Sequence, residues 1–129
     1  MNYTAFNKYC QELAATHHVI QWGDSHVWKV GGKVFAVGGW GDNIPSFTFK
    51  TAREDYDFLV QVPGVRPAPY LASRGMSWVQ NYAKPGLPDK VLKEHLRESH
   101  RIVSLGLTKK LQKQLGLNQS ARHESRLKP

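Results

Sequence analysis

The chain contains 129 residues, of which 40% are hydrophobic and 22% are charged, and its formal net charge is +8 at pH 7. This length fits one domain, and a chain of this size buries about two thirds of the surface that it exposes when unfolded. The single cysteine, Cys10, excludes an internal disulfide and a metal site built from several thiolates of this chain. No apolar run approaches the roughly 18 residues that a membrane-spanning helix needs, and no signal-peptide pattern opens the chain. We therefore expect a cytoplasmic protein that does not associate with membranes, with a monomer as the default state.

The positive charge is concentrated in the last third of the chain. Residues 1–83 carry seven basic and six acidic side chains, whereas residues 84–129 carry eleven basic and four acidic ones, a net charge of +1 against +7. Such an excess favours polyanionic partners such as nucleic acids. It is equally typical of a solvated helix face and a basic tail that keep a protein soluble, so charge alone does not choose between the two.

The N-terminal part predicts a helix, a turn and a β-hairpin. Thr4 is the expected N-cap of the helix, whose apolar side chains recur at spacings of three and four residues, namely Tyr3, Phe6, Cys10 and Leu13. Residues 22–24 are expected to turn. The hairpin is predicted over residues 26–37, because two runs rich in β-formers flank a Gly31-Gly32 pair that accepts the positive φ angles of a type I′ turn. A two-residue loop places Trp28 opposite Phe35 on the core side, with Val27, Lys29, Val34 and Ala36 on the other side.

The central part predicts a connector, a strand and a short helix. Residues 38–43 are glycine-rich like a phosphate-binding loop, but no Lys-Ser/Thr pair and no helix follow them, so we expect a flexible connector. A strand is expected over residues 44–50, with Phe47 and Phe49 on one side. Residues 51–54 have the pattern of a capping box. The acids after it are interpreted as complements of the helix dipole rather than as a catalytic or metal-binding cluster: Glu54, Asp55 and Asp57.

The C-terminal part predicts extended chain, a last strand and two helices. Residues 63–69 are rich in proline and are expected to form turns and extended chain, and residues 76–82 to form a strand. The longest helix is predicted from Pro88 or Asp89 to about Leu105, with an apolar arc of Val91, Leu92, Leu96, Ser99, Ile102 and Val103. Its opposite side carries the stripe Lys90, Lys93, Arg97 and Arg101, flanked by Glu94 and Glu98, which can pair with Lys90 and Arg101. This stripe fits either a phosphate-binding face or a salt-paired outer face.

The end of the chain and the order of elements complete the predicted organisation. A short helix is expected from Thr108 to Leu115, ending at Gly116, and residues 117–129 are expected to be a disordered basic tail. The succession of a helix, several strands with tight turns and then helices favours an α+β fold with an antiparallel sheet in a single domain, residues 1–116.

No arrangement of residues typical of catalysis or metal binding is found in the sequence. A G-x-S-x-G nucleophile motif is absent, and His95 and His100 are five residues apart, so they do not share a helix face as zinc ligands do. The pair His17-His18 has no recurring metal-ligand spacing to Cys10. We therefore expect no enzyme activity, no metal and no cofactor, although an enzyme of another type would show a deep pocket with clustered polar groups.

A series of short motifs, taken in order, is more specific than any one of them. It comprises Tyr9-Cys10, residues 26–36, residues 46–51, Arg66 with Pro67 and Pro69, Trp78-Val79, Leu87-Pro88-Asp89 and Ser99. This series resembles the bacterial MmcQ/YjbR family of small DNA-binding proteins, and the similarity extends over roughly residues 4–116. The sequence departs from the family pattern at Trp40, in a glycine-rich loop, and at His100, where an aromatic side chain is common.

The resemblance implies a fold similar to the frataxin/CyaY type, with antiparallel strands packed on one face by N- and C-terminal helices. It also implies a double-wing mode of contact, in which loops and hairpins reach the DNA duplex. Iron handling, which frataxin-like proteins suggest, needs an acidic first helix, and here that helix offers only Glu12.

Our leading hypothesis is a non-enzymatic DNA-binding protein that contacts mainly phosphates. Weak sequence preference is expected, because no recognition helix with base-reading side chains stands out. The candidate phosphate contacts are Lys29, Lys33, Lys50, Arg53, Arg66, Arg74 and Lys84, and Trp40 is a candidate for stacking on an exposed base. The alternative is an accessory module that binds a protein or a small ligand and whose basic surface does not serve nucleic acid.

Overall fold

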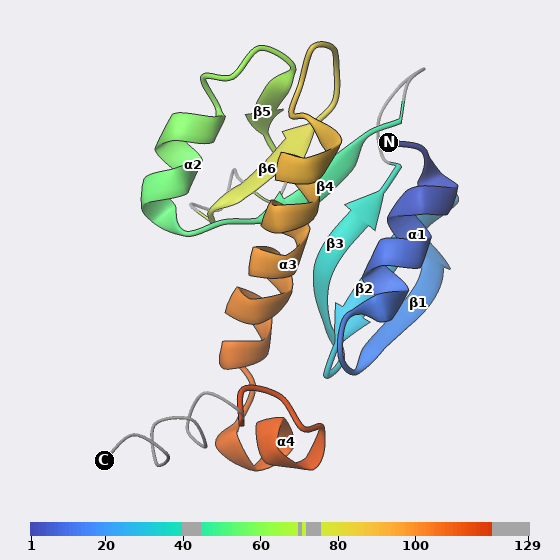
Figure 1. Ribbon diagram of the computed structural model, residues 1–129, viewed down its shortest axis with the longest axis vertical. Helices are drawn as coiled ribbons and strands as arrows, with labels where there is room; N and C mark the ends of the chain where they lie inside the picture. Colours follow the sequence, from blue (N-terminus) through green and yellow to red (C-terminus); the bar gives the residue numbers. More distant parts are fainter. Residues whose placement is uncertain (40–44, 70, 72–75, 120–129) are drawn as a thin grey trace.

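A six-stranded antiparallel sheet forms the centre of the fold, and helices cover one of its faces (Figure 1). The computed structural model describes residues 1–39, 45–69, 71 and 76–119. The strands lie in the order β1-β2-β3-β4-β6-β5. They are β1 (Thr16–Gln21), β2 (Ser25–Val30), β3 (Lys33–Gly38), β4 (Phe47–Lys50), β5 (Val65–Pro67) and β6 (Trp78–Asn81). The helices are α1 (Tyr3–Glu12), α2 (Arg53–Leu59), α3 (Asp89–Leu105) and α4 (Lys109–Gln114).

The main core lies between the sheet and helices α1 and α3. One row of paired residues runs across the sheet from Trp28 through Ala36 and Phe49 to Val79. These side chains are buried in one cluster with those of α1 and α3, including Phe6, Cys10, Leu92 and Leu96. The predicted α+β fold with an antiparallel sheet and helices near both ends is therefore confirmed, whereas the likeness to the frataxin type stays a prediction.

The hairpin forms as predicted, but the predicted strand register is wrong beyond the residues next to the turn. Gly31 and Gly32 both have positive φ, 57° and 83°, as a type I′ turn requires. A β-bulge between Trp28 and Lys29 then shifts the pairing, so that Trp28 lies opposite Ala36 instead of Phe35. The extra residue lets both Phe35 and Ala36 enter the core cluster, which corrects the prediction that Ala36 lies on the other side.

Two predicted helix caps are wrong, and two strands were not predicted. Asn2, rather than Thr4, caps α1, and its Oδ1 accepts a hydrogen bond from the Ala5 N–H at 2.8 Å. Thr51 makes no capping box, because its hydroxyl donates to the carbonyl of Ala52. Strands β1 and β5, the two edge strands of the sheet, were not predicted from the sequence.

Ser99 joins two strands where their pairing stops. Strands β3 and β4 are paired only from Ala36–Phe49 to Gly38–Phe47, and beyond that point they diverge. The fully buried Ser99 hydroxyl of α3 fills the gap: its oxygen accepts from the Lys50 N–H at 2.8 Å and it donates to the Phe35 carbonyl at 2.6 Å. One side chain thus satisfies two backbone groups that a longer ladder would otherwise pair.

The C-terminal helices match their predicted ranges closely. Helix α3 runs from Asp89 to Leu105, and Thr108 caps α4 by accepting a hydrogen bond from the Leu111 N–H. Leu117, the first residue of the predicted tail, is buried in the core. Residues 120–129 lie outside the described part of the chain.

The buried ring of His100 links α3 to the end of α1, and we predict that it makes the fold sensitive to acid. Its Nε2–H donates to the Ala14 carbonyl at 2.7 Å. Burial lowers the pKa of His100, although this hydrogen bond opposes the shift. The unfolded chain therefore takes up a proton at higher pH than the folded protein does, so the free energy of unfolding must fall as the pH drops below about 6.5.

Urea unfolding between pH 8 and pH 5 tests this prediction. The variant His100→Gln can keep a donor toward Ala14 but cannot titrate, and we expect its free energy of unfolding to fall less steeply with acid. The free energy of unfolding of the variant at pH 8 serves as the control. At that pH the imidazole is neutral in the folded and the unfolded chain, so the two proteins differ only in the shape of the side chain. Equal acid sensitivity of the two proteins would contradict the prediction.

Candidate nucleic-acid interface

The structure surrounds two of the predicted phosphate contacts with groups that already engage them. Arg53 is exposed at the start of α2, where its guanidinium lies 3.7 Å from the Asp57 carboxylate beside two further acids. The Arg66 Nε donates to Gln80 Oε1 at 2.9 Å, and its guanidinium lies 4.1 Å from the centre of the Tyr82 ring. Both guanidinium groups therefore already have partners within the protein.

Three other predicted lysines lie near the turn of the β2–β3 hairpin. Lys33 is exposed at the start of β3, and Lys29 is half-buried and paired with Val34. Lys33 and Val34 line the same groove as the half-buried Lys50, although Lys50 is 17 residues away in the sequence from Lys33. The sheet therefore gathers Lys29, Lys33 and Lys50 at the end where β3 and β4 diverge.

Lys84 lies at the opposite end of α3 from α4. It is exposed in the turn before α3, whose 17 residues extend over about 25 Å. Helix α4 begins only after the C-terminal end of α3. Lys84 therefore does not share a surface with α4. Arg74 and Trp40 fall outside the described residues.

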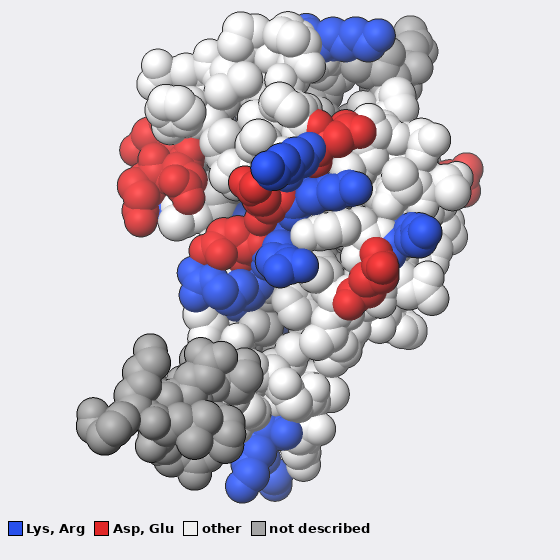
Figure 2. All heavy atoms as spheres, viewed as in Figure 1, with Lys and Arg blue, Asp and Glu red and all other residues white. Residues whose placement is uncertain are grey.

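The predicted basic stripe on α3 is interrupted by acids. The Arg101 Nε donates to Glu98 Oε2 at 2.9 Å, which confirms the predicted pair and lowers the pKa of Glu98. Figure 2 shows blue and red side chains alternating along α3 and red ones gathered over α2. This side of the molecule is therefore of mixed charge, as a salt-paired outer face is.

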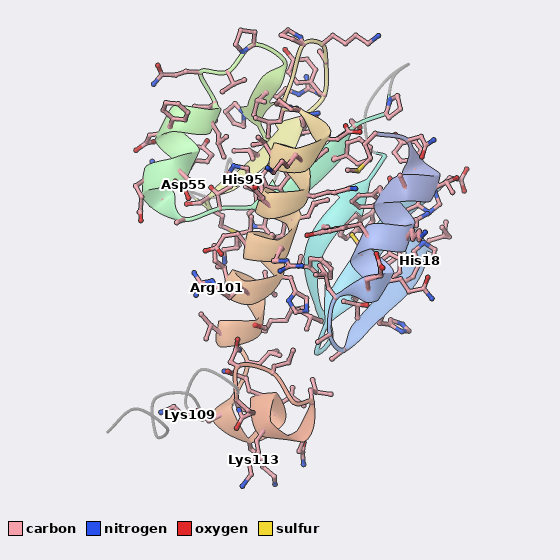
Figure 3. The ribbon with its side chains drawn as sticks, viewed as in Figure 1. His18, Asp55, His95, Arg101, Lys109 and Lys113 are labelled. Atoms are coloured by element: carbon pink, nitrogen blue, oxygen red, sulfur yellow. The ribbon has the colours of Figure 1, made fainter. Side chains whose placement is uncertain are left out.

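Helix α4 carries three basic side chains in a stretch of sequence without acids, and none of them is among the predicted phosphate contacts. Lys109, Lys110 and Lys113, named here the α4 lysines, are all exposed, and residues 106–119 include no Asp or Glu. They line a groove of about 520 Å³ together with Leu105, Gln112, Asn118 and Gln119. Figure 3 shows Lys109 and Lys113 directed away from the sheet. The absence of acids from residues 106–119 can be read from the sequence, whereas the exposure of the three lysines is known only from the structure.

A network of amides and hydroxyls holds α4 in place. The Gln112 Nε2 donates to the Leu107 carbonyl at 2.8 Å, and the Asn118 Nδ2 donates to Gln112 Oε1 at 2.9 Å. The same Asn118 amide lies 3.1 Å from Ser104 Oγ on α3. These anchors are uncharged, and no hydrogen bond or ion pair within the described residues engages the side chains of the α4 lysines.

The hairpin turn lies at the same end of the molecule as α4. The Lys33 Nζ donates to the Gly106 carbonyl at 3.5 Å, three residues before α4 begins. Gly31 of the turn is packed so closely against Leu107 that a Cβ there would lie 2.5 Å from the Leu107 side chain. We name Lys33 and the α4 lysines together the basic end.

The described residues contain no cluster suited to metal chemistry. Among them, no group of three or more His, Cys, Asp or Glu side chains is placed to hold a metal ion. His18 and His26 approach one another, with His18 Nε2 3.1 Å from His26 Nδ1. Burial lowers the pKa of His18, and His26 and His17 lower it further, which favours the neutral form of the His18 ring. Burial raises the pKa of the Cys10 thiol, which makes it a poor nucleophile.

Within the described parts of the chain, none of the helices combines the length and the apolar character needed to cross a bilayer.

The fold and the charge distribution define a small α+β protein with a basic end. Residues 11–102 match the model of the YjbR family, and the chain therefore belongs to this family. Its structure is similar to that of Deinococcus radiodurans protein DR2400, which has a DUF419 domain, with a TM-score of 0.79 and 25% identity over 90% of this chain and 88% of the other. A protein from Pseudomonas syringae has the same fold, with a TM-score of 0.65 and 21% identity over 79% of this chain and 98% of the other. No curated protein matches the sequence.

Proposed function

We propose that the protein binds duplex DNA through its backbone phosphates and that the basic end is the contact surface. The observation that carries the proposal is the α4 lysines, three exposed ammonium groups on one short helix with no acid among residues 106–119. Family membership agrees with it, because DNA binding is the activity that the resemblance implied. Enzyme activity plays no part in the proposal.

The geometry of the basic end suits phosphates better than base edges. Lysine ammonium groups act as point charges toward phosphate, whereas base reading relies on the bidentate groups of Arg, Asn and Gln. Helix α4 has only six residues, which gives it little length to lie along a groove. The β2–β3 hairpin brings Lys33 beside α4 and serves as a wing in this proposal. We therefore expect weak sequence preference.

Binding to duplex DNA at a series of salt concentrations tests the proposal. Each neutralised phosphate contributes about −0.9 to the slope of log K against log salt, so four lysine contacts give a slope of about −3.6. Two duplexes of the same length and unrelated sequence should bind with nearly equal affinity. Undetectable binding at about 50 mM salt, or affinity that does not change with salt, would contradict the proposal.

A further inference from the structure

A second groove lies beside the basic end and has a different chemical character. It is lined by residues from β3, β4, β6 and α3 and has a volume of about 350 Å³. We name it the α3–sheet groove, and its lining is Lys33, Val34, Lys50, Met76, Trp78, Ile102, Val103 and Gly106. It forms where β3 and β4 diverge, because the missing strand pairs leave space between the sheet and the end of α3.

The lining combines an apolar wall with two cationic groups. Of the eight described lining residues, five have apolar side chains: Val34, Met76, Trp78, Ile102 and Val103. Met76 is 38% exposed, so part of this apolar surface faces solvent. The two cationic side chains, Lys33 and Lys50, come from different strands, and none of the described residues that line the groove is acidic. A concave apolar surface with a few polar groups is typical of a small-molecule site.

Trp78 supplies a polar group that has no partner among the described residues. Its side chain is only 5% exposed, and its Nε1–H has no hydrogen-bond acceptor in the described structure. A buried donor without an acceptor costs about 1–3 kcal/mol, so such groups are rare and call for a physical reason. An acceptor atom of a bound molecule would satisfy the Trp78 donor.

We propose that the α3–sheet groove binds a small organic anion with an apolar body, such as a medium-chain carboxylate. The carboxylate lies between the ammonium groups of Lys33 and Lys50, and the apolar body packs against Met76 and Ile102. The ligand also supplies the acceptor that Trp78 lacks. Lys33 belongs to both proposed sites, whereas the three α4 lysines do not line this groove, so most of the proposed DNA contact surface lies outside it.

Calorimetric titration with octanoate and with octan-1-ol tests the proposal, since the two probes share an apolar body and differ in charge. We expect octanoate to bind at least about tenfold more tightly than the alcohol, because a charge-assisted hydrogen bond contributes about 1.5–3 kcal/mol. No detectable octanoate binding at about 10 mM, or equal affinity for the two probes, would overturn the proposal.

Substitutions in the α3–sheet groove test whether octanoate binds there. Lys50→Gln keeps the backbone N–H that Ser99 binds but removes the ammonium group, and we expect it to weaken octanoate about tenfold without affecting octan-1-ol. Trp78→Phe keeps the packing and removes the donor, and it should weaken octanoate several-fold. Lys110→Gln in α4 is the matched control and should bind octanoate like the wild-type protein. An equal loss in Lys110→Gln, or no loss in Lys50→Gln, would overturn the assignment.

A DNA arm separates this proposal from the proposed function. A duplex containing one unpaired base is titrated with and without saturating octanoate. A fully paired duplex of the same length is titrated in parallel. Because Lys33 is shared, we expect octanoate to weaken both duplexes equally and by no more than the loss of one of the four proposed lysine contacts. Stronger competition with the duplex that has the unpaired base would instead assign the groove to a nucleobase and overturn the small-anion proposal, while leaving phosphate binding by the α4 lysines unaffected.

Discussion

Replacing Gly64 with alanine is expected to lower the free energy of unfolding by about 2–6 kcal/mol. Gly64 has φ of +92°, a conformation in which a side chain costs about 1–3 kcal/mol, and a Cβ there would lie 2.2 Å from the Ala83 carbonyl oxygen. That contact is with backbone, so relief requires movement of the turn that follows β6, at a further cost of about 1–3 kcal/mol. The Gly64 carbonyl also accepts from the N–H groups of Tyr82 and Ala83, so this movement strains both hydrogen bonds.

Gly32→Ala is the matched control for this substitution. Gly32 has φ of +83°, close to that of Gly64, but a Cβ there meets nothing within 4 Å. We therefore expect only the conformational cost, about 1–2 kcal/mol. Urea unfolding of both variants measures the difference, and equal destabilisation would show that the contact with Ala83 is not the dominant effect.

Replacing all three α4 lysines by glutamine is expected to lower the affinity for duplex DNA by more than about 100-fold at 0.1 M salt. Three lost phosphate contacts should also make the slope of log K against log salt shallower by about 2.7. Fluorescence anisotropy over a range of salt concentrations measures both quantities. The fold should be retained, because α4 is anchored by Gln112 and Asn118 rather than by its lysines.

A control with the same change in net charge distinguishes a local surface from general attraction. The triple variant Lys8→Gln, Lys84→Gln and Lys90→Gln removes three exposed ammonium groups outside α4. We expect it to keep most of the affinity and nearly the full salt slope. An equal loss in both triple variants would contradict the assignment of the contact surface to α4.

Local patterns in the sequence predicted the elements that depend on local interactions. Helix α3 was predicted to within one residue, because its apolar arc and the proline before it are local signals. The hairpin turn was predicted from two glycines, but the bulge after Trp28 was not, since it depends on fitting both Phe35 and Ala36 into the core. Strand β1 was missed because its exposure, set by its place at the edge, gives no regular alternation.

The candidate sites were predicted less well than the fold, for a related reason. Which cations lie together depends on strand pairing across long stretches of chain, as with Lys33 and Lys50. The neutralisation of Arg53 by Asp57 was readable at helical spacing, but the contact of Arg66 with Gln80 required knowledge that β5 pairs with β6. The α4 lysines could have been predicted from the sequence alone, because residues 106–119 contain no acid.

The hydroxyl of Ser99 connects ligand binding in the α3–sheet groove with the stability of the sheet. It closes the sheet at the place where the α3–sheet groove begins, and its acceptor contact is with the N–H of Lys50, a residue whose side chain lines that groove. Any molecule that binds better when Lys50 is held in this position stabilises the closed sheet by the same free energy that the closed sheet contributes to binding. Through Ser99, ligand binding in the groove and the contact between β3 and β4 are therefore thermodynamically linked.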